Sequence, residues 1–277
     1  NVLKDIIDSE AFSVVRLSKI YRQAESSHIV LNAHKINAGE LITLNNKNKD
    51  FFFFEKQDVR SVMGALIYLV KTKLPEYIGT SPFEIQVLTP MRKGELGVEH
   101  LNEVLQYYLN PASESKKEKE GRTGVFREGD KVMQVKNNYK LEWKITNAKG
   151  FSVEEGLGVF NGDMGVIKQI NTYSERITVV FDENREVEYP YSNLDELELA
   201  YAITIHKSQG SEYPAVVLPL LSGPPILCNR NLLYTAITRA QKCAAIVGRQ
   251  SMVEQMIHNE TEQKRYSGLN ECLKDGI

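Results

Sequence analysis

Apolar residues in the first part of the chain follow two different spacings. Between 59 and 70, and again between 98 and 109, they recur at every third or fourth position, which predicts two amphipathic helices. Residues 28–37, preceded by serines and followed by a glycine, predict a third helix. The short apolar runs at 14–17 and 84–90 predict strands. Strands that alternate with helices of this length favour a parallel sheet covered by helices.

The pattern changes after residue 124. Short apolar segments follow one another, and the sequences NGD at 161–163 and DEN at 182–184 are typical of the tight turns between strands. No helical spacing interrupts 157–190, so this part predicts a small antiparallel barrel. The polar segment 113–124, in which lysines and glutamates are mixed, predicts a loop.

The alternation of strands and helices returns after the barrel and continues to the end of the chain. We therefore expect an α/β fold in which residues 1–139 and 196–277 form one domain and residues 140–195 form an inserted barrel. The strands on either side of the insert, within 126–135 and 197–205, are expected to belong to the main domain. In that case a short linker should be able to replace the barrel.

The composition is that of an ordinary globular protein, with 42% hydrophobic residues, 25% charged residues and a net charge of −2. Any affinity for nucleic acid must then come from a local surface rather than from the overall charge. No apolar run is long enough to span a membrane. Cys228, Cys243 and Cys272 are scattered and form no metal-binding spacing, which predicts neither a disulfide framework nor a zinc site and fits the reducing cytoplasm.

Three polar segments border apolar strands or helices, at 21–27, 203–220 and 232–241. In open α/β sheets the ligand crevice lies at the carboxyl ends of the strands, so we expect these segments to meet there. Arg239 follows apolar neighbours and needs a partner. Either it forms a structural salt bridge, or it is an arginine finger that stabilises charge on a γ-phosphate. Arg22 allows the same two interpretations.

The middle segment gathers hydroxyl, imidazole, ammonium and amide groups around Gly210. Such donors suit the phosphate oxygens of a nucleic-acid backbone or of a nucleotide. His206 alone would more often be a structural histidine, and Gly210 alone a turn. The run is more specific than its parts, and its polar members are Thr204, His206, Lys207, Ser208, Gln209 and Ser211.

Five segments, taken in order, resemble the second RecA-like domain of superfamily 1 helicases, and most closely the RecD-like group that includes the α subunit of exodeoxyribonuclease V. They are IYRQAESSHIVLNAHKINAG, VLTPMRKGELGVEHLNEVLQYYLNP, GVFNGDMGVI, LAYAITIHKSQGSEYPAVVLPL and LLYTAITRAQK. The resemblance covers nearly the whole chain, and its most specific part is TIHKSQGSE followed by LLYTAITRA. It implies a RecA-like motor domain with an inserted SH3-like barrel, a cytoplasmic location and no contact with a membrane.

The resemblance also implies roles for single residues. Arg22 and Arg239 would reach the γ-phosphate, and Gln23, Gly210 and Glu212 would lie against the nucleotide. The residues implied to face single-stranded DNA are Thr89, Arg92, Lys93, Thr204, His206 and Lys207. Tyr139 and Trp143, at the entry to the barrel, either stack on bases or pack between the barrel and the motor domain.

The sequence contains no GxxxxGK[ST] phosphate loop and no strand that ends in the Asp-Glu pair of a magnesium site. In the resembling helicases both belong to a first motor domain, which we expect before Asn1, so ATP and Mg²⁺ would bind the longer protein and neither would bind this chain alone. The resemblance implies movement in the 5′ to 3′ direction and possible nuclease subunits as partners. The alternatives are a nucleic-acid-binding module without motor activity and the motor part of a conjugative relaxase.

Overall fold

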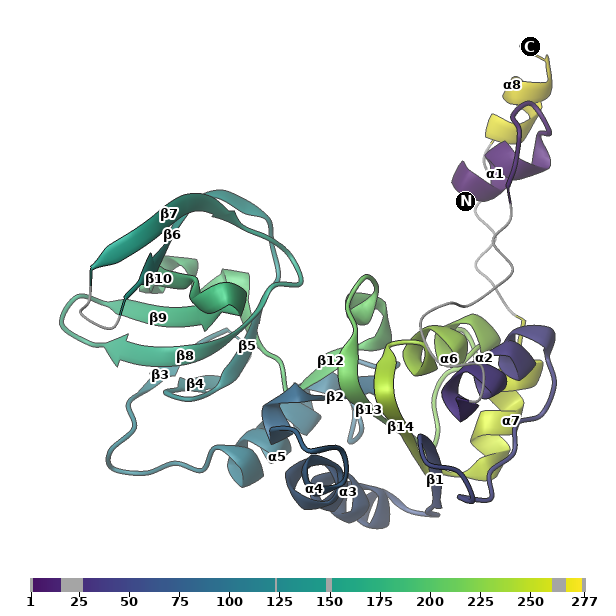
Figure 1. Ribbon diagram of the computed structural model, residues 1–277, viewed down its shortest axis with the longest axis horizontal. Coiled ribbons are helices and arrows are strands. Elements are labelled where there is room, and N and C mark those ends of the chain that lie inside the picture. Colours follow the sequence, from purple (N-terminus) through teal and green to yellow (C-terminus); the bar gives the residue numbers. More distant parts are fainter. Residues whose placement is uncertain (1, 16–26, 123, 148–150, 261–267, 276–277) are drawn as a thin grey trace.

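The computed structural model describes residues 2–15, 27–122, 124–147, 151–260 and 268–275 of the 277-residue chain. These residues form a parallel five-stranded sheet, which we call the main sheet, and an antiparallel seven-stranded sheet, which we call the barrel sheet (Figure 1). The predicted α/β fold with an inserted β-rich domain is therefore confirmed.

The main sheet has the order β1-β14-β13-β2-β12, and every neighbouring pair is parallel. Its central strands are apolar along nearly their whole length, because helices cover both faces. The strands are β1 (Phe51–Glu55), β2 (Ile85–Thr89), β12 (Ala202–Thr204), β13 (Tyr213–Leu220) and β14 (Ala240–Gly248).

Alternate residues of β13 point to opposite faces of the main sheet and enter two separate apolar cores. Val217 packs in the core with helices α3, α4 and α5, whereas Val216 packs in the core with α2, α6 and α7. Figure 1 shows the same division of the helices between two layers. The helices are α2 (His28–Ala38), α3 (Val59–Tyr68), the π-helical turn η1 (Leu69–Lys73), α4 (Leu74–Ile78), α5 (Val98–Leu109), α6 (Arg230–Ile237) and α7 (Gln250–His258).

The helices expected near 28–37, 59–70 and 98–109 are all present. Gly39 ends α2 in the left-handed conformation, at φ 77°, which a glycine adopts without steric cost. The strand expected at 14–17 is not seen at Val14 and Val15, and residues 16–17 lie outside the described residues. Two further helices, α1 (Val2–Asp8) and α8 (Leu269–Asp275), pack against each other (Figure 1).

The barrel sheet has the order β11-β5-β8-β9-β10-β6-β7, and its neighbouring strands are antiparallel. Its turns include the short helical segments η3 (Asp182–Asn184) and η4 (Tyr191–Glu196). The strands are β5 (Lys131–Gln134), β6 (Asn138–Thr146), β7 (Ser152–Val159), β8 (Met164–Asn171), β9 (Arg176–Phe181), β10 (Glu186–Pro190) and β11 (Leu197–Leu199).

The barrel sheet extends beyond residues 140–195 on both sides. Strand β5 pairs with β8 and β11, so neither β5 nor β11 joins the main sheet. The expectation that the strands flanking the insert would close the main domain is therefore wrong. The run 197–205 divides at Ala200 and Tyr201, and only its second part, β12, enters the main sheet.

Part of the segment expected to be a loop is a hairpin. Strand β3 (Glu118–Glu120) pairs with β4 (Val125–Arg127), and Glu118 lies opposite Arg127. Their side chains form an ion pair of 2.6 Å across the hairpin. The mixed charges that favoured a solvated loop therefore stabilise a strand pair, which single-residue patterns cannot reveal.

Buried polar side chains join the barrel to the main domain. Asp130, just before β5, accepts hydrogen bonds from Gln106 of α5, from Asn110 at the end of that helix and from Tyr201, at 2.6, 2.7 and 3.0 Å. Burial raises the pKa of the Asp130 carboxyl, and these donors oppose that shift. Asn102 of α5 holds the chain where it returns from the barrel, through bonds to the carbonyls of Leu199 and Ala202 and from the Ala202 amide.

Candidate nucleotide and nucleic-acid site

The segment 204–212 crosses the main sheet from one edge to the other. Thr204, the last residue of β12, lies beside Thr89, the last residue of β2. Ala215, near the start of β13, lies beside Ile85, the first residue of β2. The segment therefore runs from the carboxyl edge of the sheet, through the 3-10 turn η5 (Ile205–Ser208), to the amino edge.

The expected site residues consequently lie at two edges and not in one crevice. Arg239 immediately precedes β14 and Glu212 immediately precedes β13, which places both at the amino edge. Thr204 and the loop after β2 lie at the carboxyl edge. The prediction of a single crevice at the carboxyl ends of the strands is wrong, because the segment 203–220 joins the carboxyl end of β12 to the amino end of β13 and the segment 232–241 leads into β14.

Arg239 is fixed by backbone and hydroxyl oxygens. Its guanidinium donates to the carbonyls of Ser211 and Thr235, at 3.1 and 3.3 Å, and to the hydroxyl of Thr238 at 3.4 Å. Its own carbonyl accepts from the Tyr213 amide at 2.9 Å. No carboxylate among the described residues forms an ion pair with it, so the structural salt bridge considered from the sequence is absent from that part of the chain.

Gly210 and Glu212 lie on either side of Ser211, whose carbonyl accepts a hydrogen bond from Arg239. Gly210 has φ 90°, and no atom lies within 4 Å of the position where a Cβ would stand, so the backbone there faces open space. Glu212 is exposed, and its carboxylate accepts a hydrogen bond of 3.3 Å from Gln241. Arg239, Gly210 and Glu212 therefore form one group at the amino edge.

The carboxyl edge presents a different group. The Thr204 hydroxyl accepts a hydrogen bond of 3.3 Å from the Lys207 amide and caps η5. His206 is exposed, and its side chain forms no hydrogen bond or ion pair with the described residues. Lys93, in the loop after β2, is also exposed. Of these three residues, Thr204 uses its hydroxyl within the fold. The side chains of His206 and Lys93 form no hydrogen bond or ion pair with the described residues and can bind a ligand.

Thr89 has no exposed surface. Its hydroxyl donates to the Leu96 carbonyl at 2.7 Å and accepts from the Met91 amide at 3.4 Å. The structure therefore leaves its side chain no surface for DNA, contrary to the expectation. Thr89 shapes the loop that carries Arg92 and Lys93.

Glu198, on β11, contacts two of the expected DNA-facing residues and was not marked by the sequence. Its carboxylate forms ion pairs with Arg92, at 3.1 Å, and with Lys207, at 2.9 Å. Burial alone would raise the pKa of this carboxyl, but the hydrogen bond and charge of Lys207, and those of Arg92, hold it below its usual value. Glu198 thus links the barrel to two cations of the carboxyl edge. Its alternating LEL context resembles any strand, so no sequence signal marked it.

The two aromatic residues proposed for base stacking lie in different settings. Tyr139 is 68% exposed and packs edge-on against Phe160, with ring centroids 5.6 Å apart. Trp143 is partly buried against the barrel core and borders a pocket that contains four glutamates. Negative charge around Trp143 opposes a DNA phosphate backbone. Its contacts with Gly156 and Arg185 lie within the barrel and not between the barrel and the motor domain. Arg22 and Gln23 lie outside the described residues.

No group of three or more metal-binding side chains is arranged to hold an ion within the described parts of the chain. No helix among the described residues is long and apolar enough to cross a membrane. Cys228 and Cys243 are buried free thiols, and Cys272 is an exposed one.

Comparison with known proteins yields two family matches. Residues 101–181 match the ATP-dependent RecD-like DNA helicase SH3 domain, and residues 199–247 match the UvrD-like helicase C-terminal domain. The first match covers most of the barrel sheet, and the second covers the segment 204–212 and Arg239.

Curated relatives agree with these matches. The ATP-dependent RecD2 DNA helicase of Deinococcus radiodurans is 34% identical over 84% of this chain and 28% of its own length. The RecBCD enzyme subunit RecD of Mycolicibacterium smegmatis is 30% identical over 69% of this chain and 29% of its own length. The RecD subunit of Mycobacterium tuberculosis is 28% identical over 99% of this chain and 46% of its own length. The chain thus spans less than half the length of these relatives.

Among solved structures, the Pif1 helicase of Bacteroides in complex with ADP-AlF3 and single-stranded DNA matches 88% of this chain and 54% of its own, at 19% identity and a TM-score of 0.49. The family assignment rests on the sequence matches and not on this structure. Since the SH3 match and the curated relatives name the same group, the chain belongs to the RecD-like helicases, as a segment that carries their SH3 domain and a UvrD-like C-terminal domain.

Proposed function

We propose that this chain is the second motor domain, with its inserted barrel, of an ATP-dependent DNA helicase that moves along single-stranded DNA. One observation carries the proposal. The segment 204–212 spans the main sheet from its carboxyl edge to its amino edge, and Arg239 holds its far end through the Ser211 carbonyl. A shift of this segment at one edge is therefore transmitted to the other, which a translocating motor requires.

The amino edge is proposed as the nucleotide side. Arg239 carries a positive charge that no described carboxylate neutralises, and it points from a fixed backbone position, as stabilisation of a γ-phosphate requires. Gly210 leaves room for a ligand to approach the backbone, and the exposed Glu212 carboxylate suits ribose hydroxyls. Arg22 and Gln23 join this side on the strength of the family resemblance alone. ATP and Mg²⁺ would be held mainly by a phosphate-loop domain elsewhere in the polypeptide.

The carboxyl edge is proposed as the DNA track. The exposed side chains of His206 and Lys93, and the paired cations Arg92 and Lys207, suit backbone phosphates without reading sequence. Thr204 caps the turn that presents His206, and Thr89 shapes the loop that carries Lys93. The exposed Tyr139 can add stacking on a base. Because few cations contribute, binding by this half should be weak and sensitive to salt.

The names of the relatives motivate the finer parts of the proposal. We infer movement in the 5′ to 3′ direction, and partnership with nuclease subunits if the full protein is a RecD of the RecBCD type, as several relatives are.

The test is strand displacement by the full-length protein on a duplex with one single-stranded tail. With ATP and Mg²⁺, we expect displacement from a 5′ tail and little from a 3′ tail. The isolated 277-residue chain should show no ATPase, because its sequence contains no phosphate loop. Displacement without ATP, or DNA-stimulated turnover by the isolated chain, would contradict the proposal.

A further inference from the structure

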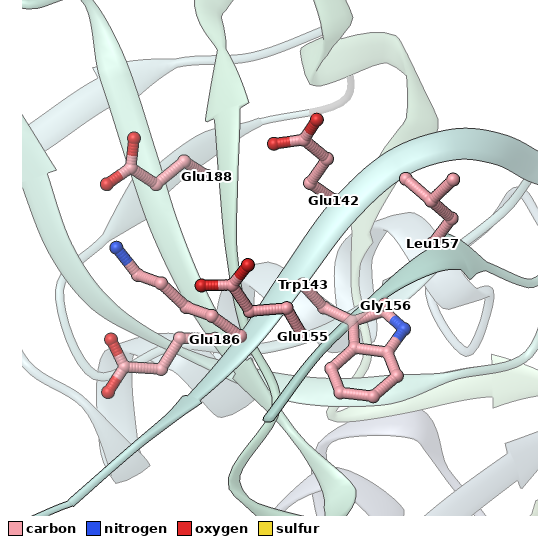
Figure 2. A pocket seen from close by; sticks show the side chains of 8 residues that line it. Glu142, Trp143, Glu155, Gly156, Leu157, Glu186 and Glu188 are labelled. Atoms are coloured by element: carbon pink, nitrogen blue, oxygen red, sulfur yellow. The ribbon is translucent and has the colours of Figure 1, made fainter. Parts of the chain in front are cut away.

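The barrel carries a pocket of about 410 Å³ whose lining includes neither the amino-edge group nor the carboxyl-edge group described above. It is formed where strands β6, β7 and β10 meet. Figure 2 shows Glu155, Glu186 and Glu188 to the left of the Trp143 ring, Glu142 above the ring, and Leu157 above it and to the right. Lys144 and Gly156 complete the lining, and we call this site the acidic pocket.

The charges of the acidic pocket do not balance, since four carboxylates face one lysine. Glu186 forms an ion pair of 2.6 Å with Lys168, a residue that does not line the pocket. Glu188 has only a loose pair with Arg176, at 3.7 Å, in which both side chains are 48% exposed. Glu142 and Glu155 form no ion pair or hydrogen bond through their side chains with the described residues. Lys144 lies opposite Glu155 and Glu186 in the register of the sheet, but it forms no ion pair with a described residue. The pocket therefore carries more negative charge than its own lysine balances.

The Trp143 ring is held in a fixed position at the base of this pocket. It lies directly over Gly156 on the neighbouring strand, where an added Cβ would approach the ring to 2.3 Å. The guanidinium carbon of Arg185 lies 5.9 Å from the ring centroid, so the indole already takes part in one cation–π contact. A rigid indole beside unpaired carboxylates is suited to bind the long side chain of an arginine or lysine.

Apolar groups and a free strand edge lie beside the charges. Strand β7 stands at the end of the barrel sheet and has β6 as its single neighbour in the order of strands. Two of its apolar side chains, Val153 and Leu157, are 63% and 64% exposed. Exposed apolar side chains on an edge strand are a common place for another polypeptide to dock.

We propose that the acidic pocket binds a lysine- or arginine-bearing segment of a partner protein. Charge complementarity selects a basic ligand and opposes nucleic acid, whose phosphates would meet four carboxylates. The apolar rim and the edge of β7 favour a polypeptide over a small polyamine, which has neither side chains nor a backbone to use them. This inference is independent of the proposed motor activity, because no residue of the acidic pocket belongs to the nucleotide or DNA groups.

Trp143 is the one tryptophan of the chain, so its fluorescence reports on this pocket alone. The probe is a synthetic peptide that alternates arginine with leucine, titrated into the 277-residue chain. We expect saturable change in Trp143 emission with this peptide and none with its glutamate counterpart. Spermidine and oligothymidylate are titrated in parallel, and we expect much weaker responses to both at the same salt concentration.

Two variants locate the binding. Glu142→Gln and Glu155→Gln each remove an unpaired, exposed carboxylate, and each should weaken peptide binding about twofold to fivefold, which is the size of an exposed charge contact. Glu154→Gln is the matched control, since it removes the same charge from the adjacent β7 residue, which does not line the pocket. It should change the affinity less than twofold.

The proposal is overturned by three results. The first is equal weakening by Glu154→Gln and Glu155→Gln, which would reduce the effect to overall charge. The second is quenching of Trp143 by oligothymidylate at lower concentration than by the peptide, which would make the pocket a base-stacking site. The third is a response to spermidine as strong as that to the peptide. Because both glutamates are exposed, loss of folding does not obscure any of these outcomes.

Discussion

At the amino edge of the main sheet, Arg239 is a half-buried cation that carbonyl oxygens hold and that no described carboxylate neutralises. In the acidic pocket of the barrel, Glu142 and Glu155 are exposed carboxylates that form no ion pair with a described cation. Water solvates these two carboxylates, whereas the Arg239 guanidinium is held in place and only partly reached by water, so an opposite charge from a ligand matters more at the amino edge. The two regions therefore call for different ligands, a phosphate in one and a basic side chain in the other.

Glu198 stands between these extremes. It pairs with both Arg92 and Lys207, so the cations of the proposed DNA track are already engaged by a carboxylate of the barrel. DNA phosphates would have to compete with Glu198 for them. The three places therefore differ in how readily an outside ligand can use their charges.

The largest expected effect is that of Arg239→Ala in the full-length protein. Loss of an arginine that stabilises the γ-phosphate should lower kcat for ATP about 10³-fold or more. DNA affinity without nucleotide should stay nearly unchanged, because Arg239 lies at the opposite edge from the proposed track. Steady-state ATPase assays and DNA titrations measure the two quantities.

The matched control for this variant is Arg176→Ala, which removes an exposed arginine from the barrel. Near-normal turnover by Arg239→Ala, with the protein folded, would make Arg239 a structural residue. Arg22→Ala is expected to lower kcat in the same way as Arg239→Ala.

The second prediction concerns a buried cation that has no carboxylate. Lys131 donates to the Phe83 carbonyl and to the Gln86 side chain, at 2.6 and 2.9 Å, and burial lowers its pKa to about 7, against a small opposing effect of Glu84. Between pH 7 and 10.5 the unfolded chain then binds a proton that the folded chain does not. The free energy of unfolding should therefore rise with pH, by up to about 1.4 kcal/mol per pH unit from this residue.

Urea denaturation at pH 7.5 and at pH 9 measures that slope. Other groups titrate in the same window, so the readout is the difference between the parent chain and Lys131→Met, in which this contribution should vanish. Lys140→Met, which changes an exposed lysine, should keep the parental slope. An unchanged slope in Lys131→Met would mean that Lys131 stays charged when buried.

The smallest predicted effect is that of Glu198→Gln. Removing this carboxylate frees Arg92 and Lys207 for phosphates, so the affinity for single-stranded DNA should rise about twofold to fivefold. The dependence of affinity on salt should become steeper at the same time. Titrations of labelled oligonucleotides at several salt concentrations measure both.

Glu99→Gln serves as the control for Glu198→Gln, since Glu99 lies 3.9 Å from Arg92 and is exposed. It should change DNA affinity less than Glu198→Gln does. An equal or lower affinity in Glu198→Gln would show that Glu198 orients the two cations for DNA and does not compete with it.

The sequence predicted the layers of the fold better than their boundaries. The helices at 28–37, 59–70 and 98–109 follow from local spacing, and the structure has all three. The membership of β5 and β11 in the barrel sheet depends on which distant strand each one pairs with, and apolar spacing carries no such information. The hairpin β3–β4 was not predicted for the same reason, because Arg127, the ion-pair partner of Glu118, lies nine residues further along the chain.

The candidate site shows a similar division. The motif order identified which residues matter, but the edge at which each residue lies depends on whether its segment enters or leaves a strand. Thr89 and Thr204 are both threonines at strand ends, but only the structure shows that Thr89 is fully buried and bonded to the Leu96 carbonyl. Glu198 could not be predicted, because it is distinguished by its ion pairs with Arg92, which is distant in sequence, and with Lys207, which lies in another element.

The central claim is that the segment 204–212 couples DNA binding at one edge to ATP hydrolysis at the other. The most direct test is the DNA stimulation of ATPase in the full-length protein carrying His206→Ala, because this exposed side chain forms no hydrogen bond or ion pair with the described residues. Thr204→Ser, which keeps the capping hydroxyl, is the conservative control. The account predicts that His206→Ala keeps the ATPase rate measured without DNA, binds oligonucleotides of unrelated sequence more weakly, and loses most of the stimulation even at saturating DNA. Full stimulation at saturating DNA would contradict it.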